Sequence, residues 1–271
     1  MWAVYDRPYI NMSRNSVVRK HHVVVVVVAC LFLCAGTMFG QSVPSQPSSE
    51  GWEFRIIPYL WGSSINGRVG VGDRTADVDA SFANVLDHLH FAFMNLVDAS
   101  WNKKFVVLTD LVYTDLRGHR ATPGPLFSSV KPNQKLFLLT PDGGYRILDK
   151  SQFSVDVVGG IRYWHLKTDL QFQPGLLPGI EVQEGRGWVD GIFGLRGKAY
   201  LSRNWWVTGY GDVGGGGSNL TYQFFGTAGV DIHKHYALAF GYRYLKVDYD
   251  KDHFLFDTAM KGPLLGFTFK F

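Results

Sequence analysis

From Gly51 to the C-terminus, apolar and polar residues alternate along the chain with a period of two. In the last segment, Leu265, Phe267, Phe269 and Phe271 share one face, opposite Gly266, Thr268 and Lys270. Segments 153–164, 188–201 and 220–231 repeat the pattern, with charges on one face and apolar or aromatic residues on the other. This period predicts β-strands whose two faces lie in different surroundings.

Polar and Gly/Pro-rich clusters divide the alternating region into ten expected strands. Short connections at 102–104, 149–151, 202–204 and 233–235 alternate with longer ones at 62–88, 117–133, 169–186, 214–218 and 250–253. The strands expected between them cover about 52–61, 89–101, 105–116, 134–147, 152–168, 187–201, 205–213, 219–231, 236–249 and 255–271. Eight or twelve strands also fit, since 65–80 could add a hairpin. One short helix is expected near 81–89, with Ser81 as its cap.

The pattern favours an all-β, transmembrane, antiparallel up-and-down barrel over a soluble sandwich. The segments are longer than the roughly 5–6 residues of an average soluble strand, and a tilted strand needs about 9–11 to cross a bilayer. A charged lumen and an apolar exterior require the observed two faces. Aromatic residues near segment ends suit the girdles of such a barrel: Trp52, Trp61, Trp101, Tyr113, Tyr145, Trp188, Tyr200, Trp205, Tyr236 and Tyr249.

Residues 1–40 differ from the rest of the chain. Arg14, Arg19 and Lys20 precede an apolar run over 23–39, which is the layout of a secretory signal peptide. An uncleaved membrane anchor is the alternative, and a lipoprotein site at Cys30 is a weaker one. We therefore expect three regions: a signal peptide over 1–40, a Ser/Pro-rich segment over 41–51 and the barrel over 52–271.

Removing the leader changes the charge and the redox chemistry of the chain. The formal net charge of the whole sequence is +4. Most of that excess lies in the leader, and the nearly neutral remainder argues against a nucleic-acid-binding surface. Both cysteines, Cys30 and Cys34, also lie in the leader. The mature chain is then expected to have neither disulfides nor thiol chemistry.

The C-terminus resembles the terminal signal of Gram-negative outer-membrane barrels, carried here by Gly266, Phe269 and Phe271. The resemblance implies that the barrel-assembly machinery reads the last strand. Residues 52–116 also resemble a largely uncharacterised family of small outer-membrane barrel proteins in the OmpA-like group. The matching motifs are Trp52-x-Phe54-x-x-x-Pro58-Tyr59-Leu60-Trp61, Thr75-Ala-Asp77-Val-Asp79-Ala-Ser81-Phe82 and Asp110-Leu-x-Tyr113. This family implies a location and a fold, and it supplies no catalytic residues.

Charged residues on the expected inner faces are the main candidate site. They could line a narrow pore, or they could form a network of ion pairs that plugs the lumen; we favour the network, because unpaired buried charges are costly. The set comprises Glu53, Arg55, Asp98, Asp110, Asp156, Arg162, Asp190, Arg196, Lys198, Asp212 and Arg243.

Other candidate motifs are weaker. Carboxylates at Asp248, Asp250 and Asp252, and at Asp73, Asp77 and Asp79, could hold Ca²⁺ but lack the EF-hand pattern. The pairs His88/His90 and His233/His235 could chelate a metal, but further ligands are not evident. Asp115, His119, Ser128 and Ser129 form no recognisable catalytic motif, and Gly214–Gly217 fits a flexible hairpin loop. We therefore expect no metal and no cofactor.

The sequence thus predicts an exported outer-membrane barrel without catalytic activity, in a structural, binding or narrow-pore role. Its expected partners are the bilayer, lipopolysaccharide and the assembly machinery, with small solutes as a further possibility. Two alternatives stay open: a lipid-modifying barrel enzyme, and a soluble periplasmic barrel with apolar faces inside and charged faces outside.

Overall fold

The computed structural model describes residues 51–71, 74–121 and 127–271. The expected signal peptide, nearly all of the Ser/Pro-rich segment and Asp73 lie outside the described residues. No helix in the described part of the chain is long and apolar enough to span a membrane. The elements are β1 (Trp52–Trp61), β2 (Ser64–Val71), β3 (Arg74–Ala80), α2 (Phe82–His88), β4 (Leu89–Trp101), β5 (Phe105–Arg117), β6 (Arg120–Ala121), β7 (Phe127–Asp149), β8 (Phe153–Pro174), β9 (Ile180–Tyr200), β10 (Trp205–Gly216), β11 (Leu220–His233), β12 (Tyr236–Lys251) and β13 (Phe254–Lys270).

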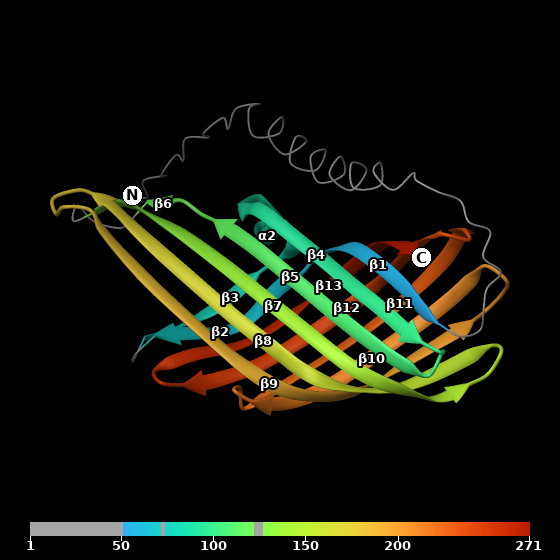
Figure 1. Ribbon diagram of the computed structural model, residues 1–271. Coiled ribbons are helices and arrows are strands. Elements are labelled where there is room, and N and C mark those ends of the chain that lie inside the picture. Colours follow the sequence, from blue (N-terminus) through green and yellow to red (C-terminus); the bar gives the residue numbers. More distant parts are fainter. Residues whose placement is uncertain (1–50, 72–73, 122–126) are drawn as a thin grey trace, which may run out of the picture. The chain divides into compact units, whose positions relative to one another are not determined.

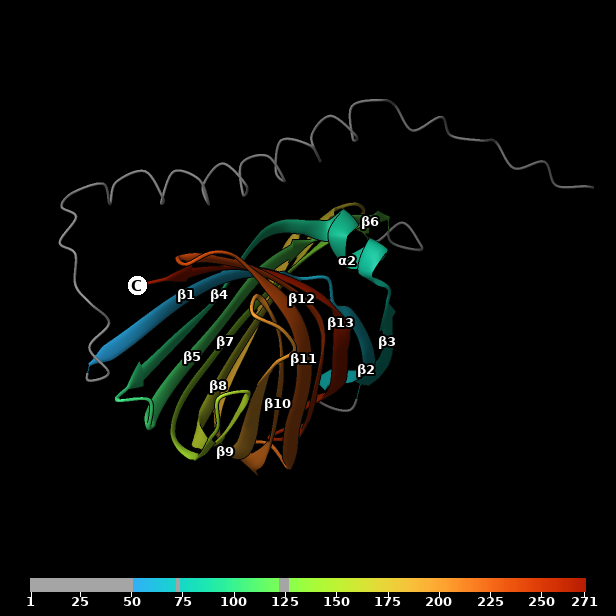
Figure 2. The ribbon, with the colours of Figure 1, turned by 90° about the vertical axis from the view of Figure 1, so that its right-hand side faces the viewer.

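The strands close into an antiparallel barrel with ten positions around its wall (Figures 1 and 2). β1 and β2 lie end to end along β13, so together they fill one position. The pairing of β1 with both β4 and β13 closes the barrel. β3 forms a hairpin with β2, and the two-residue β6 pairs with β7. The expected ten-stranded barrel is therefore confirmed, with the hairpin over 65–80 as an addition to it.

Two ends of the barrel can be distinguished by their connections. At the short-turn end, strands are joined through 102–104, 150–152, 201–204 and 234–235, within one residue of the expected turns. The backbone N–H of Phe271 donates to the carbonyl of Phe54 at this end. The opposite, long-hairpin end carries β2, β3, α2 and the extended tips of β7, β8 and β9.

Some expected loops are in fact strand. Residues 169–186 were expected as a long loop, but β8 and β9 stay paired as far as Phe172 and Ile180. β7 likewise begins at Phe127 rather than near 134, inside the loop expected over 117–133. The ladder continues because cross-strand hydrogen bonds do not require one face to be apolar.

The glycine run is also part of the sheet. Gly214–Gly216 pair with Ile192, Gly191 and Asp190 at the end of β10, so the expectation of a flexible loop was wrong. A Cβ at Gly214 would lie 2.0 Å from the carbonyl oxygen of Gly191. Glycine is required there because two strands approach closely.

Helix α2 lies beside the barrel wall at the long-hairpin end (Figure 2). The Ser81 hydroxyl caps it by accepting from the N–H of Asn84 at 3.3 Å, as expected. None of its residues is buried, so it does not fill the lumen. The pairing of β1 with β4 stops at Pro58 and Asn95, and among the described residues the 89–94 part of β4 has no strand partner on that side. We call this discontinuity the seam.

The two faces of the wall differ as expected for a membrane barrel. Outward side chains such as Phe193, Phe224 and Phe240 are 57–63% exposed, whereas inward Arg162 and Asp190 are fully buried. This arrangement is opposite to the one that a soluble barrel with an apolar ligand would need. The apolar exterior, charged interior and closed sheet together make the chain an integral β-barrel.

Aromatic side chains ring the outer surface near both ends. At the short-turn end, Trp101, Phe105 and Tyr145 form a row with ring centroids 5.4–5.6 Å apart. At the other end, Phe91 contacts Tyr113, as Phe137 contacts Tyr163. Three expected girdle residues face inward instead and are buried in the lumen: Trp61, Trp188 and Tyr249.

Candidate functional site: the barrel lumen

The alternation of side chains along each strand, which we call parity, determines which charged side chains point into the lumen. In β8 the buried positions include Asp156 and Arg162, and in β9 they include Asp190 and Arg196, each an even number of residues apart. The same alternation brings Asp98, Asp110, Asp212 and Arg243 to the inside from four other strands. Glu53, by contrast, is exposed at the beginning of β1 and lies outside the networks described below.

A central network crosses the middle of the lumen. Arg162 donates to the Asp212 carboxylate at 2.6 Å and to the Thr221 hydroxyl at 3.0 Å, and the Arg162 and Asp212 side chains are both fully buried. The amide of Gln223 donates to the same Asp212 oxygen at 2.7 Å. The Gln223 carbonyl in turn accepts from Arg243 at 2.7 and 3.0 Å. Four strands are thereby connected across the barrel.

The central network continues from Arg243 to the opposite wall. Arg243 lies 2.8 Å from an Asp110 oxygen and donates to the Tyr59 hydroxyl at 3.0 Å. Tyr59 donates to the other Asp110 oxygen at 2.6 Å. The Arg243 guanidinium also lies over the ring of Trp61, 4.8 Å from its centroid. Charge, hydrogen bonding and a cation–π contact thus offset the cost of burying this arginine.

An apolar layer fills the lumen on the long-hairpin side of the central network. Trp164 has no exposed surface and stacks on Trp188 at 5.6 Å, and Trp188 stacks on Tyr249 at 4.1 Å. Phe256 packs edge-on against Trp164. The other buried members of this aromatic plug are Trp61, Met94, Val112, Leu138, Leu166, Leu245, Val247, Met260 and Leu264.

Asp190 anchors the margin of the aromatic plug. One of its oxygens accepts from the indole N–H of Trp188 at 3.1 Å. The other accepts from the backbone N–H and the hydroxyl of Ser218, at 2.6 and 2.8 Å. The loop after β10 is thereby tied to the plug.

A second network lies toward the short-turn end. Arg196 donates to Asp156 at 2.6 and 2.8 Å and to Asp98 at 3.0 Å. Arg146 binds the second Asp156 oxygen at 2.8 Å. Arg55 lies 3.5 Å from the Asp98 oxygen that Arg196 already contacts. We call this group the lower network.

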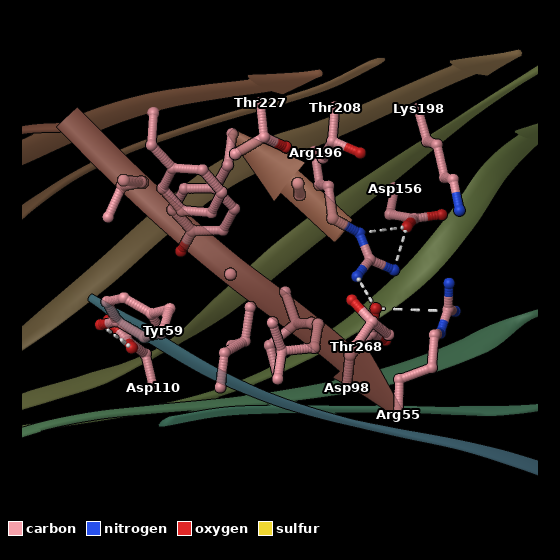
Figure 3. Close-up of a pocket in the computed structure, with 18 of the residues that line it drawn as sticks. Arg55, Tyr59, Asp98, Asp110, Asp156, Arg196, Lys198, Thr208, Thr227 and Thr268 are labelled. Atoms are coloured by element: carbon pink, nitrogen blue, oxygen red, sulfur yellow. Dashed lines mark hydrogen bonds and ion pairs between the residues drawn. The ribbon is translucent and has the colours of Figure 1, made fainter. Parts of the chain in front are cut away.

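A cavity of about 150 Å³ separates parts of the two networks (Figure 3). Tyr59 and Asp110 lie at one end of it, and Arg55 and Lys198 lie at the other with their charged ends toward each other. Its wall also includes Thr208, Thr227 and Thr268, and the stacked rings of Tyr210 and Phe225, whose centroids are 4.8 Å apart. The Tyr210 hydroxyl donates to Asp142 at 2.7 Å.

The structure brings ten of the eleven expected lumen residues inside the barrel. Four belong to the central network and four to the lower network, Asp190 lies at the margin of the aromatic plug, and Lys198 contacts the rings of Tyr200 and Trp206. The expected set contained charged residues alone, so it missed the neutral hydrogen-bonding residues Tyr59, Gln223 and Tyr210. It also missed Asp142 and Arg146, although both lie on the inward parity of β7 and alternation could have identified them.

The weaker candidates do not assemble into sites. Groups of three or more His, Asp or Glu side chains suited to a metal do not occur among the described residues. Asp252 pairs with Arg186 at 3.6 Å, and Asp79 accepts from Asn66. The ring nitrogen of His88 contacts the Asn84 carbonyl, and that of His235 contacts the Lys270 carbonyl.

Asp115 belongs to an ion cluster on the outer wall, beyond the Tyr113 girdle. It lies 2.8 Å from Arg117 and 3.3 Å from His90. Burial raises its pKa, but the hydrogen bond and charge of Arg117 outweigh burial, so the pKa is lowered overall. Within the described residues, no hydrogen bond links Asp115 with His119, Ser128 or Ser129.

No protein-family model matches this sequence, and no curated protein matches it. Among solved structures, the translocator domain of the autotransporter NalP from Neisseria meningitidis is 14% identical, with a TM-score of 0.44, covering 92% of this chain and 96% of that one. The outer membrane protease OmpT from Escherichia coli is 8% identical, with a TM-score of 0.47, covering 85% and 100%. The attachment invasion locus protein Ail of Yersinia pestis, in complex with sucrose octasulfate, is 15% identical, with a TM-score of 0.38, covering 82% and 99%.

Proposed function

We propose that this chain is a β-barrel of the bacterial outer membrane with a closed lumen and no catalytic activity. In this proposal it is exported through a cleaved signal peptide and inserted through recognition of β13 by the assembly machinery. It contacts bilayer lipid and lipopolysaccharide with its outer wall, does not bind nucleic acid, and acts as a structural or binding protein.

The filled cross-section of the lumen is the observation that carries the proposal. Arg162, Asp212 and Trp164 are fully buried although they project into the barrel. An open pore would leave such side chains in contact with water. The central network and the aromatic plug therefore support a closed barrel rather than the alternative of a selective pore.

The absence of catalysis rests on the disposition of possible nucleophiles. A serine enzyme needs a nucleophile and a base within hydrogen-bond reach. Ser218 is buried but donates to Asp190, and among the described residues Ser128 and Ser129 form no hydrogen bond to a histidine or carboxylate. The alternative of a lipid-modifying enzyme finds no support in this arrangement.

Conductance tests the proposal directly. The folded protein, purified from membranes, would be inserted into planar bilayers in salt solution, and its folded state would be checked by heat-modifiable gel mobility. We expect a folded protein without discrete conductance. Stable single-channel steps, with ion selectivity that changes in Arg196→Gln and Asp156→Asn variants, would contradict the closed lumen.

A further inference from the structure

We propose that the lumen cavity on the short-turn side binds a small amphiphilic carboxylate. The carboxylate group of this ligand lies between Lys198 and Arg55, and its apolar tail lies along the Tyr210–Phe225 stack. The inference rests on the proposed closed barrel, because the central network makes this cavity a blind pocket rather than part of a channel.

The lining of the cavity carries more cations than carboxylates. Its six cationic side chains are Arg55, Arg146, Arg196, Lys198, Arg243 and Lys270, and its four carboxylates are Asp98, Asp110, Asp142 and Asp156. Asp98 and Asp156 are each shared by two arginines, and Asp110 already holds Arg243. The cavity therefore has capacity for a further anion.

Among the described residues, Lys198 is the lining cation without a close ion pair, since Asp98 and Asp231 act on it only from a longer distance. Its ammonium lies 4.9 Å from the centroid of Tyr200 and 4.7 Å from that of Trp206, and no ion pair to it occurs among the described residues. The nearby Lys270 is occupied by Asp231 at 2.8 Å. The two aromatic ring faces orient the Lys198 ammonium but leave N–H donors of that ammonium free to bind a ligand.

Arg55 is incompletely satisfied as well. Within the described part of the chain, its buried Nε has no hydrogen-bond partner, and its one ion pair is the 3.5 Å contact with an Asp98 oxygen that Arg196 holds more closely. Arg55 and Lys198 point toward each other across the cavity (Figure 3). Two like charges facing each other in a partly desolvated space are unfavourable alone, and a carboxylate between them would relieve the repulsion.

The rest of the cavity is suited to the other part of such a ligand. Hydroxyl groups of Thr208 and Thr268 lie near the cationic end (Figure 3) and can donate to a carboxylate oxygen. Away from that end, the walls include Leu96 and Leu108 beside the Tyr210–Phe225 stack. A cavity of about 150 Å³ can hold a molecule of about the size of benzene, so the pocket suits a tail of a few carbons.

Calorimetric titration of the full, folded protein in a nonionic detergent tests the inference, with hexanoate as the probe. Hexan-1-ol tests the need for the charge, and acetate tests the need for the tail. We expect saturable binding of hexanoate and binding at least about tenfold weaker for both comparison molecules. Absence of saturable hexanoate binding, or equal binding of hexan-1-ol or acetate, would overturn the proposal.

Variants locate the site. Lys198→Met keeps much of the side-chain volume and removes the charge, so we expect at least about a tenfold loss of hexanoate affinity. Lys103→Met, in an exposed turn at the same end, is the matched control and should bind like the wild type. If Lys198→Met does not fold, Thr208→Val provides an independent variant, for which weaker binding is again expected. Unchanged affinity in a folded Lys198→Met or Thr208→Val protein would contradict the assignment.

The two proposals fail separately. A folded barrel that neither conducts ions nor binds hexanoate would contradict only the ligand assignment. A conducting barrel that binds hexanoate at Lys198 would contradict the closed lumen and the blind shape of the pocket, while leaving the head-group contacts in place.

Discussion

Arg162 and Asp212 show how single residues make a charged interior tolerable. Each is fully buried, and the pair gains further hydrogen bonds from Thr221 and Gln223. Removing one partner leaves the other charge buried without compensation, and such losses typically cost about 3–5 kcal/mol. Replacing both with apolar groups removes the desolvation cost of both charges, so it should be far less harmful than either single change.

A double-mutant cycle at this pair therefore has a definite expected outcome. Arg162→Met and Asp212→Leu should each destabilise the barrel by about 3–5 kcal/mol, and the double variant by much less than the sum. Urea unfolding in detergent micelles, followed by gel mobility, measures the three differences. Strictly additive losses would show that the two charges are not coupled.

On the outer surface, the lipid-facing position Phe193 gives the opposite kind of test. It lies on β9 between Leu195 and Val189, which are level with the two aromatic girdles, and its register neighbour Val213 is about half exposed. Phe193→Arg should cost about 2–4 kcal/mol in a bilayer, because a charge at mid-depth loses its hydration. Phe193→Leu is the control and should leave folding in lipid vesicles unchanged. Equal stability of both variants would contradict the assignment of this face to lipid.

At the level of the elements, the glycines of β10 distinguish close strand contact from flexibility. A Cβ at Gly214 would lie 2.0 Å from a carbonyl oxygen, whereas at Gly209 in the same strand it would meet nothing within 4 Å. Gly214→Ala should therefore reduce the yield of folded barrel sharply, while Gly209→Ala should fold normally. A well-folded Gly214→Ala protein in the heat-modifiability assay would argue for a wall that adjusts easily.

The ion cluster at the top of β5 predicts a pH dependence. The pKa of Asp115 is lowered in the folded protein, so the carboxylate stabilises the wall above its unfolded pKa of about 4. This stabilisation should disappear as the pH falls through the lower, folded pKa. After correction for the intrinsic exchange rate, which itself slows toward pH 3, the protection of the β5 amides should fall between pH 6 and pH 3, and an Asp115→Asn variant should lack this loss. An identical profile in that variant would exclude Asp115 as the cause.

How well the sequence predicted an element depended on its surroundings. β1 and β4 were predicted to the residue, because one face of each meets lipid and the other meets the polar lumen. The tips of β7, β8 and β9 were missed, since both of their faces are more polar there and the alternation disappears although the hydrogen-bond ladder continues. Pairing beyond the apolar belt is a property of the neighbouring strand, which a local pattern does not contain.

The sequence predicted which charged side chains point into the lumen, but it did not predict which of them pair with each other. Parity placed Arg196, Asp156 and Asp98 inside, but which arginine meets which carboxylate depends on strand tilt and side-chain reach. Trp61 and Trp188 show the same limit, because an aromatic residue near a strand end suits a girdle and a plug equally well. Their burial follows from the contacts of the closed barrel.

For the whole molecule, the main consequence of the layered lumen is mechanical. The aromatic plug, the central network and the lower network connect strands on opposite sides of the barrel, as the contacts from Arg243 to Asp110 and from Arg196 to Asp98 show. Such cross-links should make the described barrel unfold as one cooperative unit. Coincident unfolding transitions from tryptophan fluorescence and from gel mobility would support this expectation, and separated transitions would contradict it.

The seam also affects the lipid around the barrel. The β1–β4 ladder covers seven residue pairs, from Trp52 with Trp101 to Pro58 with Asn95. At about 3.3 Å per residue and a tilt of about 40°, such a ladder rises about 15 Å, against an apolar band of about 25 Å in typical barrels. The edge of β4 that faces the seam begins at Met94, which pairs with Val112 just below the Tyr113 girdle, and continues beyond that girdle. Hydrocarbon cannot solvate an unpaired strand edge, so the bilayer should be thinner along this flank than elsewhere around the wall. Through its seam, the barrel would deform the surrounding membrane locally.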